Sequence, residues 1–260
     1  MATYRALVTN DDGIDSFFLQ HLVEALLPRF TVSVAAPKTE QSWIGRAISR
    51  HSDIHVEENM DIFPKGVEAW SLTGTPSDCV NIALGHLLSS PPDIVLSGIN
   101  LGYNTTEILI LSSGTIAGAI EGTLWGIPSI AFSQAIPNAL YSEISENKGQ
   151  TDEGFNSVIQ ASAKKAAQLA LETIQQPPNK GTVLNVNFPD TMNAETGIER
   201  TQPAKIHLGS LYKEVKKDCF RFQYSEGKRL CANSQSDRDV LSRGNVSVSE
   251  LNFSQIGRPQ

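Results

Sequence analysis

The 260-residue sequence has few cysteines and a shortage of basic side chains, and it has no long hydrophobic run. Its three cysteines, Cys79, Cys219 and Cys231, are an odd number at spacings that match no zinc-binding pattern. Cys219 and Cys231 could form a disulfide, but free thiols in a reducing compartment are the better expectation. The cysteine usage therefore favours a cytoplasmic protein.

No apolar stretch approaches the roughly 20 residues that a membrane-spanning helix needs, and the N-terminal residues resemble no targeting signal. The formal net charge is −7, and Lys and Arg form no stripe. Both observations disfavour binding to the phosphate backbone of a DNA or RNA duplex. We therefore expect no membrane or nucleic-acid partner, whereas a small anionic substrate stays compatible with the sequence.

Strand-like and helical patterns alternate through the first 190 residues. Strands are expected at 4–9, 31–36, 93–97, 129–132 and 183–188, and helices at 18–27, 76–88, 115–125 and 155–176. Such an alternation produces right-handed crossovers between parallel strands. The sequence therefore predicts the α/β class, with a Rossmann-like, doubly wound and mostly parallel sheet.

The last 70 residues lose helical periodicity and contain short strand-like runs at 206–208, 220–224 and 246–248. This tail is too small for a secure core of its own. We expect one domain over 1–260, with a Rossmann-like core at 1–190. Residues 191–260 would form a β-rich C-terminal arm and a return strand, packed on the sheet or reaching another subunit.

Two adjacent acids, Asp11 and Asp12, follow the first expected strand. Adjacent carboxylates at the end of a buried strand repel each other and lose solvation unless a cation neutralises them. Asn and Asp beside Gly13 are also ordinary turn residues, so this segment alone leaves a plain turn open.

Other expected strands deliver oxygen donors to the same edge of the sheet. Ser42 lies in the loop after the second strand, and Asn100 follows the strand at 93–97. In an open α/β sheet, ligands bind at the carboxyl ends of the strands. With Asp11 and Asp12, these side chains form a donor set suited to Mg²⁺, Mn²⁺ or Ca²⁺.

Small residues precede the helix expected at 115–125, in the run Ser112-Ser113-Gly114-Thr115. Free backbone N–H groups at a helix start attract anions, although a simple N-cap by Ser113 or Thr115 is an alternative. A cation on one side and a helix start on the other would bracket a phosphate group.

Several motifs occur in one order along nearly the whole chain, and together they resemble the SurE survival-protein family. These are Asn10-Asp11-Asp12-Gly13, Ala36-Pro37 followed by Ser42, 74–80 (GTPSDCV), 97–100 (SGIN), Ser113-Gly114-Thr115 with Glu121-Gly122, and 244–249 (GNVSVS). The resemblance implies a metal-dependent nucleotidase acting on 5′- or 3′-nucleoside monophosphates. It also implies one divalent cation per subunit, and a homodimer or homotetramer formed through a swapped C-terminal arm.

Carried over by motif position, the metal ligands are Asp11, Asp12, Ser42 and Asn100, and the phosphate side is Asn104, Ser113, Gly114 and Thr115. In the resulting hypothesis, Asp11 or Asp12 orients or deprotonates the attacking water, and amides near 113–115 stabilise phosphoryl oxygens. The five histidines are scattered along the sequence, and none is placed to act as a catalytic residue.

The chain departs from the family pattern in several loops. Ser16-Phe17-Phe18 replaces a Pro-Gly pair, Trp43-Ile44-Gly45 replaces Gly-Ala-Ser, and Ser112 replaces an aromatic residue. The segment 101–112 also lacks a usual glycine and is one residue longer. The expected metal ligands survive these changes, whereas the shape of the substrate pocket is altered.

Three alternatives stay open. A haloacid-dehalogenase-type phosphatase would need Asp-x-Asp rather than adjacent acids. A receiver domain would need an acid where Asn100 stands, in a chain of half this length. A non-catalytic metal- or nucleotide-binding domain would keep the cation without turnover.

Overall fold

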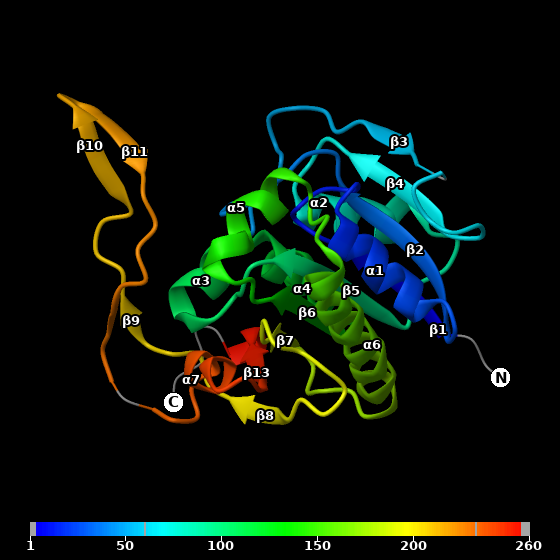
Figure 1. Cartoon of the computed structure of the whole chain (residues 1–260). Helices are drawn as coiled ribbons and strands as arrows, with labels where there is room; N and C mark the ends of the chain where they lie inside the picture. The colour runs from blue at the N-terminus through cyan, green and yellow to red at the C-terminus, as the bar shows by residue number, and fades with distance from the viewer. Residues whose placement is uncertain (1–3, 60, 232, 256–260) are drawn as a thin grey trace.

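The computed structural model describes residues 4–59, 61–231 and 233–255. The main-sheet strands are β1 (Tyr4–Thr9), β2 (Phe30–Pro37), β3 (Val56–Glu58), β4 (Glu68–Leu72), β5 (Ile94–Leu101), β6 (Ser129–Gln134), β7 (Thr182–Phe188), β8 (Ile198–Thr201) and β13 (Val246–Asn252). They form one nine-stranded sheet in the order β3-β4-β2-β1-β5-β6-β7-β13-β8 (Figure 1).

The six strands from β4 to β7 in this order run parallel to one another. β3 and β13 are antiparallel to their neighbours β4 and β7, and β8 is parallel to β13. From β1 the chain winds outward to β2 and β4 and then returns to β5 on the other side of β1. The topological switch point therefore lies between β1 and β5, and the predicted doubly wound, mostly parallel sheet is confirmed.

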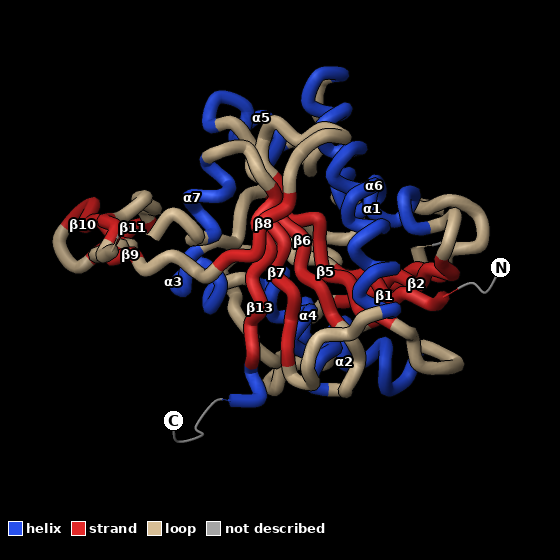
Figure 2. The backbone as a smooth tube through the Cα atoms, turned by 90° about the horizontal axis from the view of Figure 1, so that it is seen from below, coloured by secondary structure: helices blue, strands red, loops and turns tan. Residues whose placement is uncertain are grey.

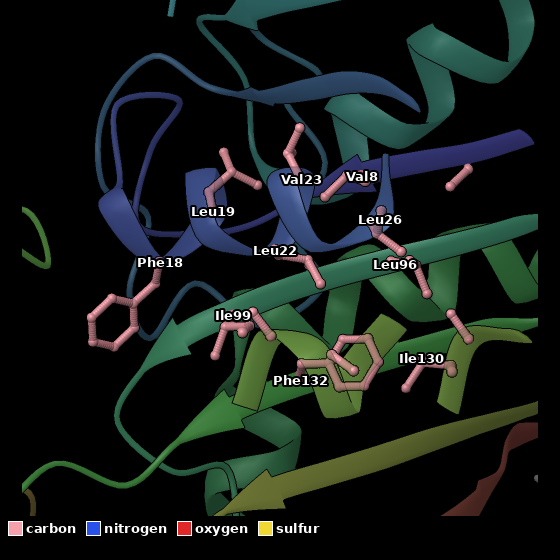
Figure 3. Close-up of a cluster of buried hydrophobic side chains, with 14 of the residues drawn as sticks. Val8, Phe18, Leu19, Leu22, Val23, Leu26, Leu96, Ile99, Ile130 and Phe132 are labelled. Carbon is pink, nitrogen blue, oxygen red and sulfur yellow. The ribbon is translucent and has the colours of Figure 1, made fainter. Parts of the chain in front are cut away.

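Helices cover both faces of the sheet. α1 (Phe17–Leu26) and α6 (Glu153–Gln175) pack together on one face, and α2 (Pro76–Ile82) packs with α4 (Gly114–Leu124) on the other. Because side chains alternate along a strand, Val8 faces the α1 core while Leu7 faces the α2 core. Figure 3 shows the first core, where α1 side chains such as Leu22 lie over Leu96 and Phe132. A short π-helix, η1 (Ala83–Leu87), continues α2.

The sequence predictions missed three helices: α3 (Thr106–Ser112), α5 (Asn138–Glu146) and α7 (Asp237–Ser242). The first two lie where loops were expected, and the third lies in the tail where no helix was expected. α5 buries only Ile144, so it has no apolar stripe to detect. α3 and α7 have seven and six residues, which is too short for a periodic signal.

The C-terminal arm stands off from the main sheet. Its strands are β9 (Ile206–His207), β10 (Tyr212–Lys216), β11 (Cys219–Phe222) and β12 (Lys228–Arg229), which pair antiparallel as β10–β11 and β9–β12. Figures 1 and 2 both show this arm extending to one side. The chain then returns through α7 to β13 beside β7, and the last described element is the 3₁₀ turn η2 (Phe253–Gln255).

The three cysteines are free, as expected. Among the described residues, no single helix has the length and apolar composition of a membrane span, although the sharply bent pair α3 and α4 has both when taken together.

Candidate active site

A cavity of about 380 Å³ opens beside the switch point between β1 and β5. Five of the residues predicted for the site line it: Asp11, Ser42, Asn100, Asn104 and Ser113. Asp12, Gly114 and Thr115 lie outside its lining, and each of them is placed by a contact described below. The fold thus gathers side chains from four segments, which are the turn after β1, the loop after β2, β5 with the loop that follows it, and the start of α4.

Asp11 is buried against the first turn of α4. The Thr115 hydroxyl donates to its Oδ1 atom, and the Thr115 backbone N–H also bonds to its carboxylate. A Cβ atom added to Gly114 would lie 2.7 Å from the Asp11 Cβ, so only glycine permits this close approach. Burial raises the pKa of Asp11 to about 6, although the Thr115 hydrogen bonds oppose the rise.

Asp12 points toward the next strand of the sheet. Its Oδ2 atom accepts the backbone N–H of Leu101, at the end of β5, at 3.0 Å. Burial raises the pKa of Asp12 well above its ordinary value, and the neighbouring charge of Asp11 adds to the rise. The Asn10 side chain closes the turn by donating to the Gly13 carbonyl at 2.8 Å. The same segment therefore forms a turn and presents two adjacent acids, so a turn and an acidic site are compatible with each other here.

Ser42 and Asn100 are each oriented by a hydrogen bond. The Ser42 hydroxyl donates to Oε1 of Glu40 at 2.6 Å. The Asn100 amide nitrogen donates to the Gly102 carbonyl at 2.7 Å, which leaves Oδ1 as the end available to a cation. Asn100 is the penultimate residue of β5. Two residues earlier, β5 passes so close to β6 that an added Cβ at Gly98 would lie 2.3 Å from the Phe132 carbonyl oxygen.

This donor set fits a hard divalent cation. Within the described ranges, none of the ion pairs involves Asp11 or Asp12. Two adjacent acids whose pKa values are raised by burial stay ionised together when a cation neutralises them. No group of three or more His, Cys, Asp or Glu side chains is gathered for a metal in the described part of the chain. Any cation here would therefore also use hydroxyl and amide oxygens.

Asn104 is held by a buried polar network under the cavity. Its backbone N–H donates to Oδ1 of Asn187 at 2.7 Å, and its side-chain amide donates to the Ser133 hydroxyl at 2.9 Å. The Asn104 carbonyl accepts from the side chains of Asn185 and Asn187. Asn104 is therefore rigidly placed at the wall of the cavity.

Some of the backbone N–H groups at the start of α4 already donate hydrogen bonds to side chains of the protein. The Ser113 hydroxyl is the N-cap and accepts the Ile116 N–H at 3.1 Å, while the Thr115 N–H bonds to Asp11. Ser113 lines the cavity, whereas Gly114 and Thr115 lie behind Asp11. The four residues predicted for the phosphate side are thus split, with Asn104 and Ser113 at the wall and the other two supporting Asp11.

Sequence reasoning missed several lining or neighbouring residues. Glu40 lies close enough to raise the pKa of both acids, and Tyr141 from α5 lines the cavity. The pKa of Tyr141 is raised by burial and then by the charges of Asp12, Glu40 and Asp11, so its hydroxyl stays protonated. The position of Glu40 two residues before Ser42 was an available signal, whereas α5 gave none.

The fold and this site define a class: a doubly wound α/β protein with two adjacent acids and the start of helix α4 at its switch point. The family described as "Survival protein SurE" matches residues 6–210. A solved structure of the SurE protein from Aquifex aeolicus has a TM-score of 0.74 and 27% identity, covering 95% of this chain and 93% of that one. The chain belongs to the SurE family.

Relatives with the name 5′-nucleotidase SurE support the same assignment. The protein from Geobacter sulfurreducens is 35% identical over 251 residues, which is 95% of this chain and 87% of that protein. The protein from Nostoc sp. is 42% identical over 187 residues, which is 71% of this chain. That match, and a second one to the protein from Trichormus variabilis, spans 63% of the relative's length.

Proposed function

We propose that this protein is a metal-dependent phosphomonoester hydrolase that removes phosphate from nucleoside 5′-monophosphates, and in part from 3′-monophosphates. The observation that carries the proposal is the meeting of Asp11, Ser42 and Asn100 with Asn104 and Ser113 in one cavity. This arrangement combines a cation-type donor set with neutral donors for phosphoryl oxygens. The name 5′-nucleotidase of the SurE relatives supports the nucleotide substrate.

The proposed ligands of one divalent cation per subunit are Asp11, Asp12, Ser42 and Asn100. When bound, Mg²⁺, Mn²⁺ or Ca²⁺ supplies Lewis-acid polarisation of a phosphoryl oxygen. Asp11 or Asp12 orients the attacking water and accepts its proton as the water oxygen bonds to phosphorus. The bond from phosphorus to the ester oxygen breaks, and that oxygen takes up the proton that the carboxylate accepted, so the products are a nucleoside and inorganic phosphate.

The phosphate side is proposed to act partly through positioning. Asn104 and Ser113 donate hydrogen bonds to phosphoryl oxygens from the cavity wall. Gly114 and Thr115 place the positive end of α4 beside the reaction and hold Asp11 in its orientation. The buried network around Asn104 keeps its amide from rotating.

Assembly and location also belong to the proposal. Residues 1–260 would act as one domain with a Rossmann-like core at 1–190 and a β-rich arm with a return strand at 191–260. The exposed β10–β11 hairpin would join subunits into a homodimer or homotetramer. Free thiols and the acidic net charge support a cytoplasmic protein without a DNA, RNA or membrane partner.

The test is phosphate release from a panel of nucleoside monophosphates with Mg²⁺, Mn²⁺ or Ca²⁺, before and after EDTA treatment. We expect activity that EDTA abolishes and that one of the cations restores. A protein that binds nucleotides yet releases no phosphate with any cation would be the non-catalytic alternative. A phospho-aspartate trapped with beryllium fluoride would indicate the haloacid-dehalogenase-type chemistry.

A further inference from the structure

Part of the cavity lining consists of aromatic side chains that the proposed phosphate chemistry does not use. Its lining includes Trp43, Tyr103, Tyr141, Phe222 and Tyr224. The Trp43 and Phe222 rings contact each other edge to face, with centroids 5.0 Å apart and planes inclined by 64°. The Trp43 and Tyr224 centroids are 5.9 Å apart. Two segments about 180 residues apart in the sequence thus meet over the cavity.

Trp43 is held in place although its side chain is not buried. Its backbone has φ 61°, a left-handed conformation that bulky residues rarely adopt, and 40% of its surface is exposed. The loop that carries it is fixed nearby, because the Gly45 N–H donates to the Ser112 carbonyl and Arg46 pairs with the buried Glu121 at 2.5 Å. Trp43 thus combines an exposed aromatic ring beside a cavity with a backbone held in an uncommon conformation. This combination indicates a ligand contact.

The arm forms the other wall and is tied to the core at the cavity. Phe222 ends β11, and Tyr224 follows it. The Tyr224 hydroxyl is hydrogen-bonded to Tyr103, and burial together with this bond raises the pKa of Tyr224. The Arg238 guanidinium lies 5.8 Å from the centre of the Tyr103 ring. The aromatic wall is therefore supported from the core side as well as from the arm.

We propose that Trp43, Phe222 and Tyr224 form a stacking site for the planar ring of the leaving group, and that Trp43 is its principal specificity-determining residue. This inference rests on the proposed function, because the same cavity holds the proposed phosphate site. Its volume of about 380 Å³ is in the range of small-molecule sites. Aromatic faces stack on any base, so the site selects for a nucleobase over an aliphatic leaving group more strongly than for one base over another.

The experiment compares adenosine 5′-monophosphate with glycerol phosphate, which has no ring. For Trp43→Ala, we expect the ratio of kcat/KM on the nucleotide to kcat/KM on glycerol phosphate to fall about tenfold, mainly through KM on the nucleotide. Trp43→Phe should retain most of the ratio. Trp125→Ala is the matched control, since Trp125 is similarly exposed at the end of α4 and does not line the cavity. Its ratio should stay unchanged.

An unchanged ratio in Trp43→Ala, including an equal loss on both substrates, would overturn the stacking site. If the wild-type protein hydrolyses neither phosphoester, the proposed function fails, and titration with adenosine then decides the stacking site by itself. Quenching of tryptophan fluorescence that disappears in Trp43→Phe and persists in Trp125→Phe would support it. No quenching, or quenching that both variants retain, would contradict it.

Discussion

The backbone N–H of Thr106 donates to Oδ2 of Asp237 at 2.7 Å, although 131 residues separate them. The other carboxylate oxygen accepts the N–H groups of Ala204 at 2.9 Å and Arg238 at 2.7 Å. Thr106 begins α3, just after Asn104, with φ 70°, and Ala204 lies where the chain enters the arm. One buried carboxylate therefore holds both the cavity loop and the root of the arm.

We predict that Asp237→Ala destabilises the fold by about 3 kcal/mol, because it leaves buried N–H groups without acceptors. The measurement is the free energy of unfolding in urea. Asp190→Ala, at an exposed turn position, is the control and should change it by less than about 0.5 kcal/mol. Equal effects of the two substitutions would refute the role given to Asp237.

The same residue predicts a pH dependence of stability. Burial raises the pKa of Asp237 in the fold above its unfolded value, against the opposing hydrogen bonds. The folded state therefore keeps the Asp237 proton up to a higher pH than the unfolded state does. The contribution of Asp237 to stability falls as pH rises from its unfolded-state pKa through its folded-state pKa. We expect the free energy of unfolding of the wild type, minus that of Asp237→Asn, to decrease from about pH 4 upward. Urea unfolding of the metal-free proteins measures it, and a difference that grows with pH would disprove the assignment.

Gly114→Ala should disturb the site far more than the fold. The added Cβ would lie 2.7 Å from the Asp11 Cβ and 2.9 Å from its Oδ2 atom, so the carboxylate must move. We expect kcat to fall about 100-fold, because a displacement of about 1 Å in a reacting group has that effect. Gly154→Ala, in the first turn of α6, is the matched control, since its added Cβ would be in ordinary contact. Phosphate-release kinetics on both variants, with circular dichroism to confirm folding, make the comparison. Unaltered kcat in Gly114→Ala would mean that the Asp11 position is unimportant.

The sequence predicted the polar edge of the sheet better than it predicted the cavity. Asp11 follows β1 and Asn100 lies at the end of β5, two strands whose apolar runs are unambiguous, so their meeting at the switch point follows from the parallel topology. Tyr141 and Tyr224 lie in a polar helix and in the arm, where no periodic pattern locates them. Trp43 was recognised as a change in pocket shape, but its contact with Phe222 depends on how the arm returns to the core. Such long-range placement has no local signal in the chain.

Asp11 and Asp12 are proposed to share one divalent cation, and calorimetric titration of the metal-free protein with Mn²⁺ measures whether they do. We predict one binding site per chain in the wild type, and binding weakened at least tenfold in Asp12→Asn. Asp15→Asn should bind as the wild type does, because Asp15 is an exposed acid paired with Lys148. Equal Mn²⁺ affinity in the wild type and Asp12→Asn, or no binding to the wild type, would show that the two carboxylates do not share a cation.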